Sequence, residues 1–331
     1  MRFTRSLSLA LTLAALWVSC ASAATAAETA PEPRWPTLQP AQRVAQVAGA
    51  PLLAAARAGN RVVAVGDHGV VLLSEDGTTF RQAQAVPVRS MLTSVQFMNP
   101  RIGYAAGHDG VVLGTQDGGE TWTLLRADPG TEQPILSLHF DSPEHGVAVG
   151  LYGWAIETRD GGRTWSELRV GTGEDADRHL FHVFASRRGT LFIAGEAGTI
   201  FRSANRGKSW QALSTGNKGS LWFGRSLIDG TLLICGMRGH LYRSDDDGQN
   251  WQAVESHTTQ SLTGITQLVD GSVMVVGLAG TVLTSTDNGK NFTLSERPGK
   301  EPLSGVLANA SRAPVLVSMA GPVPSAQPAA R

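Results

Sequence analysis

Short apolar segments separated by polar turns recur along this chain. In one stretch the segments cover residues 135–140, 145–150, 154–158 and 164–169, with turns rich in glycine and aspartate between them. Apolar runs of this length, bounded by such turns, are typical of β-strands. Four short strands in antiparallel succession form one blade of a β-propeller.

In the third predicted strand of each unit, two neighbouring positions are both apolar. The first position holds Val71, Val112, Ala155, Ile200, Leu241 and Val282, and the second holds Leu72, Leu113, Ile156, Phe201, Tyr242 and Leu283. Adjacent side chains of a strand point to opposite faces. The pattern therefore predicts sheets covered on both faces, as blades lying between two other blades must be.

A glycine pair, Gly-x-x-Gly, and an acidic motif, Ser/Thr-x-Asp/Asn followed by glycine and an aromatic residue, occur together six times. The first glycines are Gly66, Gly107, Gly150, Gly195, Gly236 and Gly277. The acidic positions are Asp76, Asp117, Asp160, Asn205, Asp246 and Asp287, each ten residues after its glycine. Successive acidic positions are 41, 43, 45, 41 and 41 residues apart. This period indicates one propeller blade per repeat.

Each half of the repeat predicts a particular turn. Gly-x-x-Gly predicts a two-residue hairpin turn between the second and third strands, where glycine accepts unusual backbone angles. The acidic side chain is expected to accept backbone amides in the turn between the third and fourth strands. The aromatic residue that starts the fourth strand is Phe80, Trp122, Trp165, Trp210, Trp251 or Phe292. Because all six units repeat this pattern, it indicates a structural role rather than an active site.

Six complete units do not use up the chain. Residues 303–308 and 315–319 read as two further strands, and residues 318–321 resemble a degenerate hairpin turn. Residues 43–48 could supply the missing outer strand and close the ring, which would remove exposed strand edges. We therefore predict an all-β fold, a seven-bladed β-propeller of four-stranded antiparallel blades, with a seventh blade composed of N- and C-terminal strands.

The N-terminal segment is typical of a cleaved export signal. Arg2 and Arg5 precede an apolar core at residues 7–18, and residues 21–23 or 24–26 offer small-residue cleavage sites. The apolar run is too short for a stable membrane span. We expect export to the periplasm, or to the thylakoid lumen in a photosynthetic host, of a protein that is not itself transmembrane.

The predicted organisation has four parts. These are a signal peptide (1–26), a proline-rich leader (27–40), the propeller (41–321) and a disordered tail (322–331). Cys20 also stands where a lipoprotein cysteine could, so a lipid anchor in the inner or outer membrane is left open. Cys235 lies in an apolar segment and reads as a small buried hydrophobe.

Composition narrows the classes of partner. The chain has 331 residues, 38 glycines, 42% apolar residues and a formal net charge of zero. High glycine content with low charge suits many short strands and tight turns, and zero net charge gives no indication of nucleic-acid binding. A closed repeat array counts as one domain. We predict a monomer without a cofactor.

The acidic motif resembles the Asp-box, or BNR, repeat. The third unit is more specific, with G-V-A-V-G-L-Y-G at residues 146–153 and E-T-R-D-G-G-R-T-W at residues 157–165. Together with the strand at residues 136–140, these segments resemble the photosystem II stability/assembly factor family over about residues 45–300. The resemblance implies a seven-bladed propeller without catalytic activity that assists assembly of a membrane protein complex. Since relatives also occur in bacteria that do not photosynthesise, it implies an exported binding propeller before it implies photosystem II.

A carbohydrate-binding or glycoside-hydrolysing propeller, similar to sialidases, is the alternative. The Arg-Ile-Pro signature of sialidases is missing, and among the three tyrosines only Tyr152 lies at a turn tip, while Tyr104 and Tyr242 lie in strands. Tyr152 and Glu196 would be the residues to test. Other catalytic motifs fail, and Asp245-Asp246-Asp247-Gly248 belongs to the repeat and lacks the glutamate of a calcium loop.

Binding residues are expected where the copies differ. Strand-two-to-strand-three tips open on the same face as the connections between blades, and such loops commonly bind ligands. Asp67, His68, His108 and Asp109 at two consecutive tips could share a metal, but solvated turns explain them better and we predict no metal. The candidate residues for a protein partner are Asp67, His68, Arg89, His108, Asp109, Arg126, Tyr152, Asp177, Arg178, His179, Glu196, Arg225 and Arg238. Asp177, Arg178 and His179 end the longest connection, residues 170–179.

Overall fold

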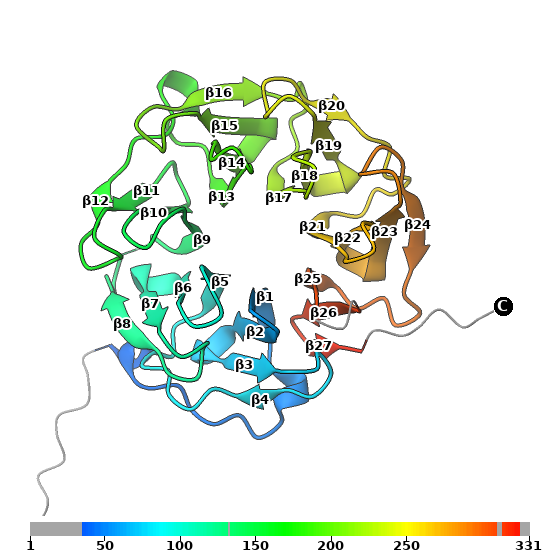
Figure 1. The fold of residues 1–331 in the computed structure, drawn as a ribbon. Helices are drawn as coiled ribbons and strands as arrows, with labels where there is room; N and C mark the ends of the chain where they lie inside the picture. The colour runs from blue at the N-terminus through cyan, green and yellow to red at the C-terminus, as the bar shows by residue number, and fades with distance from the viewer. Residues whose placement is uncertain (1–34, 132, 310–312, 325–331) are drawn as a thin grey trace, which may run out of the picture. The chain divides into compact units, whose positions relative to one another are not determined.

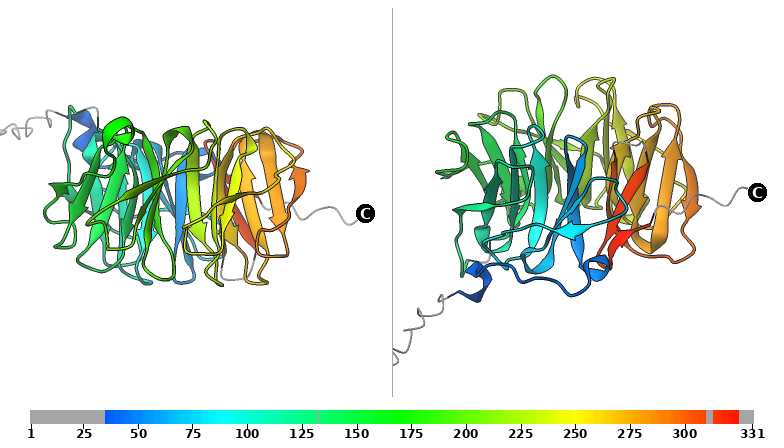
Figure 2. Two further views of the ribbon diagram at one scale, coloured as in Figure 1. Left: turned by 90° about the horizontal axis from the view of Figure 1, so that it is seen from above. Right: turned by 60° about the horizontal axis from the view of Figure 1, so that its bottom comes forward.

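The repeated strand pattern folds into seven antiparallel sheets arranged in a ring (Figure 1). The computed structural model describes residues 35–131, 133–309 and 313–324. Within each blade the strands follow one another in chain order, and the first strand lies nearest the ring axis (Figure 1). Seen from the side, the blades lie next to one another, and their strands run between the two faces of the propeller (Figure 2). The predicted seven-bladed propeller is therefore confirmed.

The blades and short helices have the following bounds. Blade 1 comprises β1 (Leu52–Ala58), β2 (Arg61–Gly66), β3 (Val71–Ser74) and β4 (Arg81–Gln82), and blade 2 comprises β5 (Leu92–Phe97), β6 (Gly103–Gly107), β7 (Val112–Thr115) and β8 (Thr123–Arg126). Blade 3 comprises β9 (Ile135–Phe140), β10 (Gly146–Gly150), β11 (Ala155–Thr158) and β12 (Ser166–Glu167), and blade 4 comprises β13 (Leu180–Ala185), β14 (Leu191–Gly195), β15 (Thr199–Ser203) and β16 (Gln211–Ser214). Blade 5 comprises β17 (Leu221–Ser226), β18 (Leu232–Gly236), β19 (Leu241–Ser244) and β20 (Gln252–Ala253), and blade 6 comprises β21 (Leu262–Gln267), β22 (Val273–Gly277), β23 (Thr281–Ser285) and β24 (Thr293–Glu296). Blade 7 comprises β25 (Leu303–Ala308), β26 (Pro314–Ser318) and β27 (Gly321–Val323). The 3-10 helices are η1 (Pro36–Leu38), η2 (Val47–Gly49), η3 (Asp67–Gly69), η4 (His108–Gly110), η5 (Gly173–Asp175), η6 (Glu196–Gly198), η7 (Met237–Gly239) and η8 (Leu278–Gly280).

The core consists of layers of apolar side chains between neighbouring blades. One such layer joins Val63 and Leu73 of blade 1 to Ala105 and Leu113 of blade 2, with Trp122 beside them. Both apolar positions of the third strands are buried in blades 1 to 5, and in blade 6 Leu283 is buried and Val282 is partly buried. Sheets covered on both faces explain why these strands do not alternate between apolar and polar residues.

The seventh blade has three strands of its own. β25 has the predicted bounds, β26 lies within one residue of its predicted bounds, and β27 includes Pro322 and Val323, which the sequence pattern assigned to the tail. The N-terminal segment expected as the fourth strand instead contains the 3-10 helix η2. It lies against β27, where the Ala48 carbonyl leaves no room for a side chain at Gly321.

Packing and hydrogen bonds join the two ends of the ring. Val44 and Val47 pack in one apolar cluster with Leu52 of β1 and Val317 of β26. Ser304 Oγ of β25 donates to the Leu52 carbonyl at 2.7 Å. The ring is thus closed by side-chain packing and single hydrogen bonds rather than by a paired N-terminal strand.

The end of the leader also contacts the propeller. The backbone N–H of Arg89 donates to the Thr37 carbonyl at 2.6 Å, and its Nε donates to the Pro40 carbonyl at 3.0 Å. The predicted signal peptide with Cys20, most of the leader, and the tail beyond residue 324 lie outside the described residues. Among those that are described, no helix has the length and apolar character to span a membrane.

Cys235 occupies the interior position that its apolar surroundings indicate. It lies in β18, is fully buried and forms no disulfide. Burial raises the pKa of its thiol far above the ordinary range. The side chain is therefore a protonated, small core residue.

Candidate functional site

The acidic motif forms the turn between the third and fourth strands, as predicted. In blade 2, Asp117 Oδ1 accepts the Thr121 backbone N–H at 3.0 Å and the Thr115 hydroxyl at 2.8 Å. Its Oδ2 accepts the Thr121 hydroxyl at 2.5 Å. Equivalent contacts surround Asp76, Asp160, Asn205, Asp246 and Asp287. These side chains are occupied by the backbone and hydroxyl groups of their own turns.

Hydrogen bonding keeps these carboxylates ionised. Hydrogen bonds from the Thr164 side chain and backbone lower the pKa of Asp160 to about 2. Burial raises the pKa of Asp117, but the hydrogen bonds from Thr121 outweigh it, and the pKa is lowered. A carboxylate whose charged form accepts several hydrogen bonds is stabilised in that form.

The motif tryptophans differ in how their indole N–H groups are satisfied. Trp122 Nε1 donates to the Gly119 carbonyl at 2.9 Å, and Trp165 Nε1 donates to the Gly162 carbonyl at 3.1 Å. The buried Nε1 atoms of Trp210 and Trp251 have no hydrogen-bond partner within the described part of the chain. The motif therefore keeps the tryptophan side chain at this position more strictly than it keeps the hydrogen bond of the indole N–H.

The Gly-x-x-Gly tips are hairpin turns in which the two glycines have different roles. In blade 1, the Val70 N–H donates to the Asp67 carbonyl at 3.0 Å, and the central residues His68 and Gly69 have φ of 54° and 69°. Two successive positive φ angles define a type I′ turn. Gly66 is extended, and a Cβ there would lie 1.9 Å from the Pro51 carbonyl oxygen.

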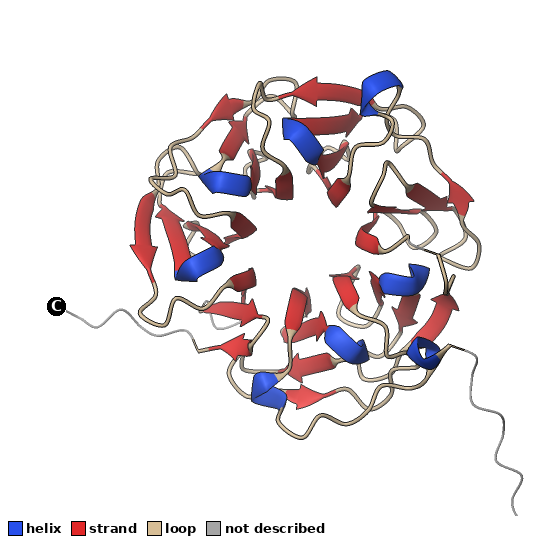
Figure 3. Cartoon of the chain, turned by 180° about the vertical axis from the view of Figure 1, so that it is seen from behind, coloured by secondary structure: helices blue, strands red, loops and turns tan. Residues whose placement is uncertain are grey.

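The residue before the second glycine of each tip adopts the left-handed conformation although it is not glycine. These residues are His68, Asp109, Tyr152, Ala197, Arg238 and Ala279, with φ between 52° and 56°. Five of the six tips form short 3-10 turns spaced around the ring (Figure 3). The left-handed backbone at this position is therefore shared by blades 1 to 6, while the side chain differs.

Backbone hydrogen bonds place the tips beside the connections between blades. The N–H groups of Gly69, Gly153 and Gly280 donate to the carbonyls of Ser90, Arg178 and Glu301, at 3.0, 2.9 and 3.0 Å. Each acceptor precedes the first strand of the following blade. The tips and the connections thus form one continuous face, as the sequence predicted.

The tip of blade 3 borders a cleft of about 760 Å³ on this face. Tyr152, Gly153 and Trp154 form one side, and residues 167–171 together with Ala176 and Asp177 form the other. Tyr152 is 67% exposed, the highest exposure among the large apolar and aromatic side chains described, shared with Ile228. An exposed aromatic residue beside a cleft is typical of binding surfaces.

His179 holds Tyr152 in place. The rings of Tyr152 and His179 meet edge to face with centroids 4.6 Å apart, and the Tyr152 backbone N–H donates to His179 Nδ1 at 2.9 Å. The His179 backbone N–H in turn donates to Glu196 Oε2 at 3.2 Å. Three predicted residues are therefore brought together, with His179 between the other two.

The 170–179 connection is ordered by contacts of its own. Arg178 Nε donates to Asp175 Oδ1 at 3.3 Å, and η5 forms within the connection. The space at Gly171 is taken by the Asp175 carbonyl, and the space at Gly153 by the Ala176 carbonyl. These close approaches seat the connection against the blade 3 tip.

Trp154, which the sequence analysis did not select, stands next to a selected arginine. The Arg126 guanidinium lies 5.7 Å from the centroid of the Trp154 ring and donates to the Gly110 carbonyl at 2.6 Å. Trp154 follows the turn glycine and starts the third strand in the pattern. An aromatic residue there, where the other units carry Val70, Val111, Thr199, His240 and Thr281, was the available signal.

The other tip residues are spread around the face. His68 Nδ1 contacts Asp67 of its own turn at 3.0 Å, and Asp109 Oδ2 accepts the Ser90 hydroxyl at 2.8 Å. No group of three potential metal ligands exists among the described histidine, cysteine, aspartate and glutamate residues. Arg238 is exposed at the blade 5 tip, beside a separate depression of about 430 Å³.

Arg225 is not part of this face, contrary to the sequence-based expectation of a connection between blades. It lies in β17 and pairs with Leu233, near the strand end opposite the tips. The sequence analysis counted Arg225 among the connections between blades, but the strand Leu221–Ser226 extends through it. Arg89 is on its predicted connection, where it binds the leader.

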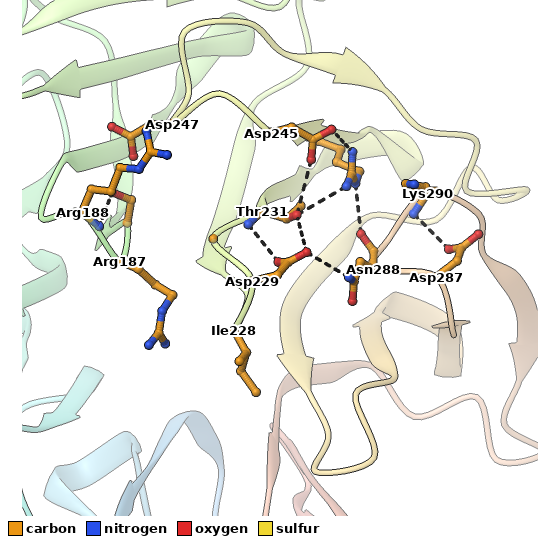
Figure 4. Close-up of a pocket in the computed structure, with 13 residues that line it drawn as sticks. Arg187, Arg188, Ile228, Asp229, Thr231, Asp245, Asp247, Asp287, Asn288 and Lys290 are labelled. Atoms are coloured by element: carbon orange, nitrogen blue, oxygen red, sulfur yellow. Dashed lines mark hydrogen bonds and ion pairs between the residues drawn. The ribbon is translucent and has the colours of Figure 1, made fainter.

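A second concave region lies on the opposite face, between blades 4, 5 and 6 (Figure 4). This cavity of about 510 Å³ is lined by Arg187, Arg188, Ile228, Asp229 and neighbouring residues. Asp229 Oδ2 accepts the Thr231 hydroxyl at 3.0 Å and the Asn288 side-chain amide at 2.9 Å. The sequence analysis did not anticipate it, because its residues come from three separate repeats.

Comparison with known proteins supports a relationship over the middle of the chain. A family model described as photosynthesis system II assembly factor YCF48 matches residues 127–276. This stretch contains every residue that lines the blade 3 cleft. No curated protein matches the chain.

Solved structures share the propeller fold at low sequence identity. YCF48 bound to D1 peptide is 18% identical with a TM-score of 0.67, over 86% of this chain and 94% of that chain. YCF48 from Cyanidioschyzon merolae is 16% identical with a TM-score of 0.64, over 85% and 96%. A streptogramin B lyase is 10% identical with a TM-score of 0.71, over 85% and 94%. Because one of these proteins is a lyase, the fold does not by itself decide between binding and catalysis.

The fold and the tip face define a seven-bladed β-propeller with one variable face. Residues 127–276 of this propeller match the model of the photosystem II assembly factor YCF48. The third unit, whose motifs resemble that family, lies within the matched segment.

Proposed function

We propose that this protein is a non-catalytic binding propeller that holds an extended segment of a membrane protein complex subunit during assembly. The observation that carries the proposal is the blade 3 cleft, with Tyr152 held at its edge by His179. YCF48, a structural relative, has been solved with a D1 peptide bound. The cleft falls within the part of the chain that matches this family.

The chemistry of the cleft suits a peptide with an apolar or aromatic side chain. Tyr152 and Trp154 provide apolar surface, while Arg169 and Asp177 are exposed charges at the same cleft. Aromatic anchors beside polar groups are typical of protein interfaces. The turn that carries Tyr152 is closed by the Trp154 N–H, which donates to the Leu151 carbonyl at 3.0 Å. This closure orders the Tyr152 backbone before binding, which reduces the entropy lost on binding.

The proposal has two further parts, namely that the protein has no catalytic activity and that it is exported. The first rests on the family match, and the second on Arg2, Arg5 and the apolar core at residues 7–18. N-terminal sequencing of the protein recovered from cell fractions tests export. A chain that retains Met1 in the cytoplasm would contradict it.

Peptide binding is tested by Tyr152→Ala with a matched control. Alanine already occupies the equivalent position in blades 4 and 6, as Ala197 and Ala279 with the same φ, so the variant is expected to fold. Arg238→Ala changes the equivalent position of blade 5 and serves as control. Photocrosslinking in the host membrane, followed by peptide titration, should show affinity reduced about 30-fold in the Tyr152 variant, a typical loss for a central aromatic residue. Equal capture by wild type and both variants would exclude this cleft as the site.

A further inference from the structure

The seven innermost strands contain basic residues and no acidic residue. These strands are β1, β5, β9, β13, β17, β21 and β25, and their charged or titratable side chains are Arg57, His139, His182 and Arg225. The whole chain, in contrast, has 28 basic and 28 acidic residues. The strands around the ring axis therefore carry positive charge without a carboxylate among them.

Among these basic residues, Arg225 is an arginine without a counter-charge in the described part of the protein. Its guanidinium makes no hydrogen bond or ion pair within the described residues. In contrast, Arg202 of blade 4 pairs with Asp247, and Arg243 of blade 5 pairs with Asp245. Its side chain remains accessible to solvent although β17 is an innermost strand (Figure 1). The protein around it lowers its pKa by desolvation. An accessible guanidinium without a counter-charge in the protein keeps its N–H donors free for an anion from solvent.

His182 of the neighbouring innermost strand provides a second donor. Its Nδ1 accepts the backbone N–H of Gly224 at 3.3 Å, and its ring stacks on Phe223 at a centroid distance of 4.1 Å. Desolvation, together with the charges of His139 and Arg225, lowers the pKa of His182 to about 3. A neutral ring that accepts at Nδ1 carries its proton on Nε2. No protein acceptor for this Nε2–H is found among the described residues.

We propose that the inner surface of the ring binds a small oxyanion, such as phosphate or a short carboxylate, between Arg225 and His182. The guanidinium can donate two parallel hydrogen bonds to an oxyanion, and the Nε2–H of His182 can donate a third. The bound anion supplies the counter-charge that the innermost strands lack. The site belongs to blades 4 and 5 and is near the strand ends opposite the tips, so it does not depend on the proposed peptide cleft.

Thermal unfolding in chloride buffer tests the proposal. Phosphate and succinate are titrated separately at pH 7, with ionic strength held constant by sodium chloride. At least one of them should raise Tm saturably, on the order of 2 °C or more, because an anion that binds the folded state stabilises it. A rise in Tm with succinate but not with phosphate identifies the ligand as a carboxylate. A rise with phosphate but not with succinate identifies it as phosphate. No saturable rise with either anion would overturn the proposal.

Two variants locate the effect. Arg225→Gln should abolish the rise, while Arg188→Gln, which changes an exposed arginine on the opposite-face turn of blade 4, should retain it. In the chloride buffer without phosphate or succinate, Arg225→Gln should be at least as stable as wild type, because no protein partner is lost. A rise that persists in Arg225→Gln would place binding elsewhere, and a large loss of stability would show that Arg225 has a partner in the protein.

A direct measurement complements the melting data. For the anion that raises Tm, NMR should show selective line broadening with wild type and not with Arg225→Gln, using the ³¹P line for phosphate and the ¹H line for succinate. The ¹⁵N resonances of the His182 ring should shift on saturation, because an anion beside the ring favours its protonated form. Line broadening without any change at His182 would leave Arg225 as the site and exclude the histidine from it.

Discussion

The two kinds of turn at the ends of each blade show how one repeat serves two purposes. At the acidic turns, the side chain itself closes the turn, as Asp117 does by accepting hydrogen bonds from Thr115 and Thr121. At the tips, glycine and backbone hydrogen bonds close the turn, and the side chain at the left-handed position is not needed for closure. A side chain that closes a turn must be kept, whereas a side chain outside the closure is free to differ.

This difference explains where binding residues can arise in the ring. Tyr152, Arg238 and Ala279 occupy the same backbone position in three blades with no shared chemistry. Asp160, Asp246 and Asp287 are chemically the same and make the same contacts. The following predictions separate the backbone requirement at the tips from the side-chain requirement at the acidic turns.

The largest effect is expected at the first glycine of a tip. A Cβ at Gly66 would lie 1.9 Å from the Pro51 carbonyl oxygen, so the backbone must move. At Gly195, the same position in blade 4, the nearest atom is the Thr199 oxygen at 3.2 Å. We expect Gly66→Ala to lower the free energy of unfolding by about 3 kcal/mol or more, and Gly195→Ala by about 1 kcal/mol. Urea denaturation measures both, and equal losses would refute the close-approach explanation.

A smaller effect is expected at an acidic turn. Asp117→Ala removes the acceptor of three hydrogen bonds and should cost about 1–2 kcal/mol, similar to loss of a helix cap. Asp117→Asn should cost less than about 0.5 kcal/mol. In blade 4, Asn205 already accepts the Ser209 N–H at 3.0 Å in this role. If the asparagine variant were as unstable as the alanine variant, charge rather than hydrogen-bond geometry would hold the turn.

The smallest effect concerns acid. Since the pKa of Asp160 is about 2 in the folded protein, and that of an unfolded aspartate is about 3.9, the folded state holds its proton less tightly. Its contribution to stability is present above pH 4 and is lost as the pH falls toward 2. Asp160→Asn should therefore lose less stability than wild type between pH 4 and 2. Parallel curves of urea midpoint against pH for the two proteins would show that this carboxylate does not contribute.

Much of the fold could be predicted because its periodicity is local. The strand of residues 135–140 and the two apolar columns follow from patterns within one repeat, and the structure confirms them. The left-handed residue of each tip was harder to foresee. Tyr152 and Arg238 carry Cβ atoms that disfavour positive φ, and it is the type I′ closure that imposes it.

The parts that the sequence did not reveal depend on contacts between distant segments. Residues 43–48 have an apolar pattern compatible with a strand, but tight packing at Gly321 accommodates a 3-10 helix there. Arg225 looked like a loop residue because the position of β17 at the ring axis is a property of all seven blades together. Trp154 became a cleft residue only through the 170–179 connection, which comes from the far side of its blade.

The closure of the ring has a consequence for the order of folding. Leu52 receives its hydrogen bond from Ser304, 252 residues later, and Val47 packs on a cluster that needs Val317. The first blade therefore keeps one side uncovered until almost the whole chain has been synthesised. Blades 2 to 6 can stack as the chain emerges, but the two ends meet last. We expect that a protein without the final strands forms an open ring with exposed apolar surface, which aggregates, rather than a closed ring with fewer blades.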